Sequence, residues 1–302
     1  MNIIKRETPK LGKFISEEGR EDFILAYNEA MAILPPPQKR FDIKTKYGSV
    51  RVYYFVTVEN KNEEPIMLLN GRSASTPMWE SNLEGLMVER PIYSIDLLGE
   101  PGMSIQQQPI IDSRDQAEWL REVIAKLDLQ RVHLVGVSIG GWMAMNLVRF
   151  YPERIASISL LEPFQVFAPM SLKLIAMSIP FTIPVIPKVI REKMLSVISG
   201  GAEADDSVPV AKLIESGMRN YKVKLPYPQS FSIEELQAIE LPILALMGEK
   251  STVHNSKKAV ENGKNYVKNI EIESWENASH AINGEFSSEV NARILEFVKN
   301  HS

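Results

Sequence analysis

The sequence predicts a protein of the α/β class, with a mostly parallel sheet and helices on both of its faces. Several short runs consist almost entirely of apolar residues, as expected of strands that are covered on both sides. Segments with helical spacing lie between these runs, which is the chain order of parallel strands joined by crossover helices. The apolar runs are residues 66–69, 92–95, 132–137, 155–161 and 243–247.

The first part of the chain predicts a helix followed by a hairpin. Residues 17–34 place apolar side chains, among them Phe23 and Tyr27, on one stripe before a run of prolines ends the pattern. Residues 41–45 and 50–58 alternate apolar and polar side chains around a glycine turn, which indicates an antiparallel hairpin at a sheet edge. Further on, residues 113–129 show the clearest helical pattern between two strands.

An insertion interrupts the rhythm of strands. Residues 163–239 show no strand of their own and contain an apolar segment, 171–190, that is broken by Lys173 and three prolines. These breaks argue against a membrane helix, so we interpret the insertion as a helical cap and expect no membrane insertion. The predicted division is an N-terminal helical extension (1–40), a core (41–162 and 240–302) and the cap (163–239).

Composition excludes several classes of function. The 302 residues are 44% hydrophobic and 24% charged, which is typical of a globular protein. The formal net charge is −4 with no basic stripe, so we expect no nucleic-acid partner. There is no cysteine, metal-ligand cluster, phosphate loop or dinucleotide glycine pattern, so we expect neither metal nor cofactor. The first residues lack a signal-length apolar run, which predicts a cytoplasmic location. The oligomeric state is left open.

The strongest motif is Gly136-Val137-Ser138-Ile139-Gly140. An apolar strand leads into it and a helical pattern follows, which is the setting that a G-x-S-x-G nucleophile elbow requires. Glycines on either side of the serine relieve crowding in a sharp turn that raises the hydroxyl at the carboxyl end of the sheet. The pattern therefore predicts Ser138 as a nucleophile.

From Phe41 onward the sequence resembles the α/β-hydrolase fold superfamily, and is similar to bacterial carboxylesterase-type members with a helical cap. The resemblance implies a mostly parallel sheet of the eight-stranded type. Residues 70–73, Asn-Gly-Arg-Ser, occupy the place of the family's His-Gly loop. The family's oxyanion hole then implies backbone N–H donors from Arg72 and Ile139. Residues 96–104 are similar to a structural loop of the family.

The general base is predicted to be His280. It follows a strand-like run and precedes the final helix, as the catalytic histidine does in the family. Of the other histidines, His254 is interpreted as a solvated loop residue. His133 is expected to point away from the site, and His301 lies in the tail.

The acid departs from the family pattern, because Ser251 stands where an aspartate is usual after the fifth apolar run. A serine cannot stabilise an imidazolium by charge. Glu162, at the end of the strand beside the nucleophile strand, is the preferred substitute, because its longer side chain can reach the same imidazole nitrogen. Glu249, which shares strand parity with position 251, is a second candidate. A third interpretation is that no acid is present and hydrolysis has been lost.

These residues predict a serine hydrolase that acts on small-molecule carboxylic esters with small to medium hydrophobic groups, through an acyl-enzyme. The apolar cap sequence favours a hydrophobic substrate, although the same residues also serve to pack a cap onto a core. Two alternatives stay open. One is a non-hydrolytic ligand receptor or regulatory protein on the same fold, and the other is a hydrolase of C–C, amide or thioester bonds.

Overall fold

The computed structural model describes residues 11–171 and 208–302. The proline-rich segment that sequence analysis assigned to the cap (171–190) lies outside the described residues, apart from Ser171. Of the predicted cap, the structure describes residues 163–171 and 208–239.

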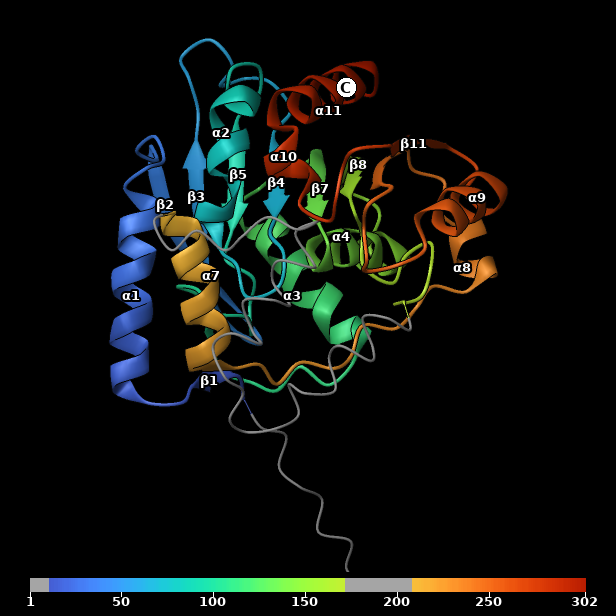
Figure 1. Cartoon of the computed structure of the whole chain (residues 1–302). Coiled ribbons are helices and arrows are strands. Elements are labelled where there is room, and N and C mark those ends of the chain that lie inside the picture. Colours follow the sequence, from blue (N-terminus) through green and yellow to red (C-terminus); the bar gives the residue numbers. More distant parts are fainter. Residues whose placement is uncertain (1–10, 172–207) are drawn as a thin grey trace, which may run out of the picture.

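A twisted, mostly parallel sheet forms the centre of the molecule (Figure 1). In the described residues, the strand order is β11-β10-β8-β7-β4-β5-β3-β2, with the short β6 paired to β3. Strands from β5 to β11 in this order run parallel, whereas β3 is antiparallel to β2 and β5. The bounds are β2 (Lys39–Thr45), β3 (Gly48–Phe55), β4 (Ile66–Leu69), β5 (Ile92–Ile95), β6 (Ile105–Gln106), β7 (Val132–Val137), β8 (Ile155–Leu161), β10 (Ile243–Gly248) and β11 (Ile270–Trp275). The predicted sheet and its edge hairpin are confirmed.

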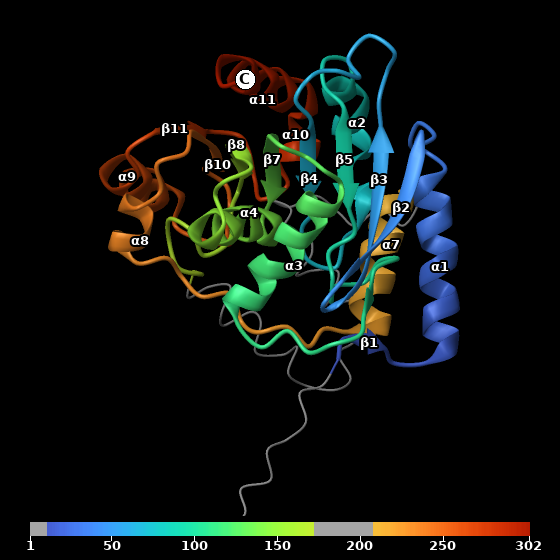
Figure 2. The ribbon, with the colours of Figure 1, turned by 180° about the vertical axis from the view of Figure 1, so that it is seen from behind.

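Helices cover both faces of the sheet, as the opposite views in Figures 1 and 2 show. Helices α3, α4 and α9 pack on one face, and α1, α2 and α11 pack on the other. Each face buries its own apolar cluster, because successive side chains of a strand point to opposite sides. The bounds are α1 (Glu17–Met31), η1 (Thr76–Trp79), α2 (Glu80–Met87), α3 (Ser113–Lys126), α4 (Ile139–Phe150), α7 (Pro209–Asn220), α8 (Ile233–Gln237), α9 (Ser256–Tyr266), α10 (Ile282–Glu285) and α11 (Ser287–Asn300).

The prediction that residues 163–239 contain no strand is wrong. The two-residue strand β9 (Tyr221–Lys222) pairs antiparallel with β1 (Lys13–Phe14) from the N-terminal segment. Next to this pair, α7 lies alongside α1 (Figure 1), and Ile15 donates its backbone N–H to the carbonyl of Asn220 at 2.9 Å. Two residues are too few to produce an alternating pattern, so sequence periodicity could not reveal this strand.

Asp96, at the end of β5, connects the N-terminal helix to the loops around the sheet. Its carboxylate is fully buried and accepts hydrogen bonds from the Tyr27 hydroxyl (2.9 Å), the Thr76 amide (2.9 Å) and the Met103 amide (2.8 Å). Burial raises the pKa of Asp96, although these donors oppose the shift. The Tyr27 hydroxyl also lies 2.9 Å from the Tyr53 hydroxyl. The loop that follows Asp96 is thereby fixed against the core.

Removing the Tyr27 hydroxyl should therefore weaken the fold. We expect Tyr27→Phe to lower the free energy of unfolding by about 2 kcal/mol, because a buried carboxylate loses a donor. Urea denaturation at neutral pH measures this change. Tyr54→Phe is the matched control, because Tyr54 is only partly buried and its hydroxyl makes no hydrogen bond among the described residues. Equal stability of the two variants would contradict the role given to Tyr27.

Candidate active site

Ser138 occupies a strained turn between β7 and α4. Its backbone has φ 52° and ψ −113°, a conformation that non-glycine residues rarely adopt. The turn brings α4 close to β4, so that a Cβ added to Gly140 would lie 2.0 Å from the carbonyl oxygen of Leu69. A Cβ on Gly136 would lie 2.5 Å from the carbonyl of Gly140. Both glycines of the motif are therefore required by close backbone contact.

The backbone of Ser138 is tied to the end of the neighbouring strand β8. Its N–H donates to the carbonyl of Leu161 at 3.0 Å, and its own carbonyl accepts from the N–H of Phe164 at 3.0 Å. Glu162 lies between these two partners and has a positive φ of 50°. The candidate nucleophile and the candidate acid thus lie on two segments whose backbones are hydrogen-bonded to each other.

Glu162 contacts the predicted base. Its Oε2 lies 3.1 Å from Nδ1 of His280, and its Oε1 accepts the backbone N–H of Gly248 at 2.6 Å. The Glu162 side chain is fully buried, whereas that of His280 is 12% exposed. Burial alone would raise the pKa of Glu162, but the two neighbouring imidazoles, His254 and His280, outweigh this effect and lower the pKa to about 2. The carboxylate is therefore ionised at neutral pH and stabilises a positive charge on His280.

Glu249 and Ser251 do not reach His280. The side chain of Glu249 is exposed and accepts a hydrogen bond from the Ser274 hydroxyl at 2.8 Å. Ser251, at the position of the family's usual aspartate, accepts the backbone N–H of Val253 through its hydroxyl at 3.4 Å. The structure thus brings Glu162 to His280 and leaves Glu249 at the surface.

The interpretation of His254 as a solvated residue is wrong. The residue is 4% exposed, and its Nε2 lies 3.5 Å from Oε1 of Glu162. It follows β10 and is therefore at the carboxyl edge of the sheet, where the chemistry of this kind of sheet is found. That position was the signal in the sequence that could have pointed to it.

His133 forms a second cluster of serine, histidine and glutamate. Its Nδ1 lies 2.8 Å from the Ser157 hydroxyl, and its Nε2 lies 3.1 Å from Oε2 of Glu64. Ser157 is only 1% exposed, so no substrate can reach its hydroxyl. Burial lowers the pKa of His133 to about 4, which keeps the ring neutral. This cluster lies near the start of β7 and serves the packing of the core.

The loop after β4 carries one predicted oxyanion donor. Asn70 closes this loop, because its side-chain amide donates to the carbonyls of Gly71 (3.0 Å) and Ala74 (2.5 Å). Buried Glu100 accepts the backbone N–H of Ser73 at 3.2 Å and lies 3.5 Å from the Arg72 guanidinium. Within residues 11–171 and 208–302, the backbone N–H groups of Arg72 and Ile139 donate to no protein acceptor. Their shared action on an oxyanion stays a prediction.

Ser138 and His280 are not hydrogen-bonded to each other in the described part of the chain. In structures without a substrate, catalytic hydrogen bonds are often long or poorly aligned, so this geometry does not exclude the predicted pairing. Ser138 itself is only half-buried, which leaves its hydroxyl open to a ligand.

A small, largely apolar pocket begins beside Ile139, the residue that follows Ser138. Leu97, Trp119 and Leu225 contribute to its walls, and Arg72 and Glu100 are its charged members. Its volume of about 10 Å³ is room for about one water molecule, so the pocket does not admit an ester in this conformation.

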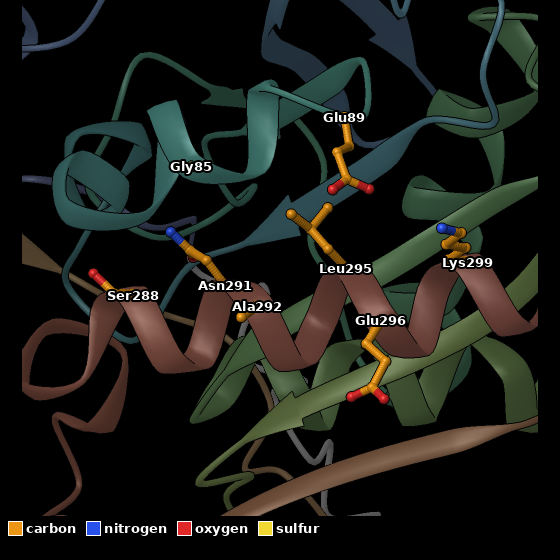
Figure 3. Close-up of a pocket in the computed structure, with 8 residues that line it drawn as sticks. All are labelled: Gly85, Glu89, Ser288, Asn291, Ala292, Leu295, Glu296 and Lys299. Atoms are coloured by element: carbon orange, nitrogen blue, oxygen red, sulfur yellow. The ribbon is translucent and has the colours of Figure 1, made fainter.

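A separate hollow lies between α2 and α11 (Figure 3) and contains none of the residues described above. Its wall includes Glu89, Leu295 and Lys299, and Gly85 admits the side chain of Asn291, whose amide would lie 2.4 Å from an added Cβ. Asn291 binds Asn82 of α2 through its side chain at 3.0 Å. This hollow is a helix–helix contact rather than part of the candidate site.

Residues 11–171 and 208–302 contain no group of three or more acidic, histidine or cysteine side chains that could hold a metal ion. None of their helices has the length and apolar character needed to cross a membrane.

Comparison with known proteins agrees with this geometry. Residues 64–181 match the alpha/beta hydrolase fold family. The uncharacterized carboxylesterase nap of Bacillus subtilis is 27% identical, with 90% of each chain covered. Carboxylesterase YbfK of the same organism is 25% identical, covering 95% of this chain and 96% of that one. The crystal structure of naproxen esterase from B. subtilis superimposes with a TM-score of 0.84 at 26% identity, covering 93% of this chain and 98% of that one.

The chain therefore has the α/β-hydrolase fold, as the sequence predicted. Within that fold it is a carboxylesterase-like protein, similar over nearly its whole length to the B. subtilis carboxylesterases.

The close contact at Gly140 makes a direct prediction. We expect Gly140→Ala to lower the free energy of unfolding by roughly 3 kcal/mol or more, because the new Cβ must displace the backbone of β4. Chemical denaturation measures this loss. Gly284→Ala is the matched control, since a Cβ there meets nothing within 4 Å. A Gly140→Ala variant as stable as the control would show that the elbow can relax.

Proposed function

We propose that this protein is a serine carboxylesterase in which Ser138 is the nucleophile, His280 the general base and Glu162 the acid. The observation that carries the proposal is the contact between buried Glu162 and His280, because the segment of Glu162 is hydrogen-bonded to the Ser138 turn. Ester hydrolysis is the function that the relatives support, since they are named carboxylesterases. They do not favour the alternative of a receptor without activity.

In the proposed reaction His280 removes the proton of the Ser138 hydroxyl as its oxygen attacks the ester carbonyl. The negative charge that forms on the carbonyl oxygen is stabilised by the N–H groups of Arg72 and Ile139, which have no protein acceptor among the described residues. Protonated His280 then gives its proton to the leaving alcohol, and an acyl-enzyme remains. Water, activated by His280 in turn, attacks the acyl-enzyme and releases the acid.

Glu162 supports this cycle through charge and orientation. Its carboxylate fixes Nδ1 of His280 and thereby presents Nε2 as the proton acceptor. Because the carboxylate is buried, its attraction for the imidazolium is weakly screened by water. The longer glutamate side chain allows an acid on β8 to replace an aspartate after β10.

The substrate that we propose is a small-molecule ester with small to medium hydrophobic groups. The names of the relatives support an ester, and the apolar side chains beside Ile139, such as Leu97 and Leu225, support a hydrophobic group. The assignment of residues 163–239 to a cap and the cytoplasmic location are parts of the same proposal. Cleavage of C–C, amide or thioester bonds by the same residues is the second candidate, which a panel of substrates would separate from ester hydrolysis.

The proposed nucleophile can be tested by covalent labelling and by substitution. We expect the protein to hydrolyse p-nitrophenyl butyrate and to be labelled at Ser138 by a fluorophosphonate. Ser138→Ala should lose labelling and at least about 10⁴-fold in kcat, because the acyl-enzyme no longer forms. Mass spectrometry identifies the labelled residue. An unlabelled and inactive wild-type protein would favour a receptor instead.

The proposed acid can be tested by comparing variants of the two candidate glutamates. Glu162→Gln should lose about 10²- to 10⁴-fold in kcat, because the amide cannot stabilise the imidazolium by charge. Glu249→Gln is the matched control and should retain wild-type activity, because its side chain faces solvent. Steady-state kinetics and circular dichroism of both variants test this expectation. The opposite ranking of the two would transfer the role of acid to Glu249.

A further inference from the structure

Both oxygens of the Glu162 carboxylate contact other groups, and the proposed triad explains only the contact of Oε2 with His280. On Oε2 lies Nδ1 of His280 at 3.1 Å. On Oε1 lie the backbone N–H of Gly248 at 2.6 Å and Nε2 of His254 at 3.5 Å. The ionisable side chains that contact Glu162 in the described residues are thus two histidines, from the loops after β10 and β11.

The position of His254 is fixed by its own surroundings. Its side chain is 2% exposed, and its backbone forms an antiparallel bridge with Met170. The adjacent Val253 accepts the backbone N–H of Ser171 at 2.8 Å. The imidazole is therefore held against Glu162 by the segment that follows β8, which begins with Glu162 itself.

The Nε2 atom of His254 is buried and forms no hydrogen bond within the described residues. A buried polar atom without a partner is unfavourable, and Oε1 of Glu162 is an acceptor 3.5 Å from this atom. A neutral ring with its proton on Nε2 satisfies both groups after a small approach. That arrangement leaves His280 free to exchange protons while the carboxylate stays in place.

We propose that His254 is a positioning residue, which donates a hydrogen bond to the Glu162 carboxylate on the oxygen that does not contact His280. This bond fixes the carboxylate and weakens its attraction for the proton of the catalytic imidazole. The role of Glu162 in this inference rests on the proposed function. In the family pattern the loop after β10 carries the acid itself, at the position of Ser251. In this protein the same loop supplies His254, which donates a hydrogen bond to the acid.

Loss of the His254 donor has an effect of predictable sign. A carboxylate with fewer donors keeps more of its negative charge and holds a proton on His280 more strongly. The base then becomes protonated at a higher pH, so the acid limb of the kcat/KM profile moves upward. A residue that only fills space would lower activity or stability without moving this limb.

The test compares His254→Leu with His254→Gln. Glutamine is the conservative variant, because its Nε2 lies at the same number of bonds from Cβ as Nε2 of histidine. With p-nitrophenyl butyrate we expect His254→Leu to lower kcat about tenfold at neutral pH with little change in KM, and to move the acid limb upward by roughly one unit. His254→Gln should return both values toward wild type. His301→Leu is the control, because His301 lies at the end of α11.

A second measurement observes the rings of the wild-type protein and does not depend on activity. The chain has four histidines, so nitrogen NMR can assign each ring with single substitutions. We expect the His254 ring to carry a proton on Nε2, because donation to Oε1 of Glu162 requires it. A proton on Nδ1 instead, or an acid limb that His254→Leu leaves in place, would overturn the proposal. Failure of the wild type to hydrolyse esters would overturn the proposed function while leaving the NMR result to decide the contact.

Discussion

A buried carboxylate joins the carboxyl ends of three adjacent strands in this protein. Glu162 directly follows β8, accepts the terminal amide of β10 and contacts the histidine that follows β11. An ionised group in such a place is stable only when donors surround it, so each of these loops must keep its conformation for the others to remain satisfied. The geometry of the candidate site thus depends on one charge and its partners more than on the packing of the loops.

Two other buried acids repeat this arrangement along the same edge of the sheet. Asp96 fixes the loop after β5 through donors from α1, η1 and its own loop. Glu100, within that loop, contacts the guanidinium of Arg72 and the amide of Ser73 after β4. Loops offer little apolar surface to bury, and directed hydrogen bonds to a buried carboxylate provide an alternative source of rigidity. Positive φ angles at Ser73, Ser138 and Glu162 lie in the segments that these acids hold.

Much of this could be predicted from sequence, because the central strands are buried on both faces and are therefore continuously apolar. Four of the five apolar runs coincide with observed strands, and the fifth extends by one residue to Gly248. The elbow was visible because its glycines are required by backbone contacts alone. The burial of His254 and the pairing of β9 with β1 depend on residues far apart in the chain, and no local pattern encodes them. The choice between Glu162 and Glu249 likewise required the direction of each side chain.

The docking of α1 against α7 also bears on how the chain reaches its fold. Asp22 of α1 and Arg219 of α7 form an ion pair across 197 residues of sequence. During synthesis from the N-terminus, the helix that is made first must therefore wait for most of the chain before its partner exists. Contacts between residues so far apart form late in folding, because the entropy lost on closing such a long loop is offset only after the intervening sheet has formed. Until then the buried side of α1, including Phe23, is exposed to chaperones and to other nascent chains.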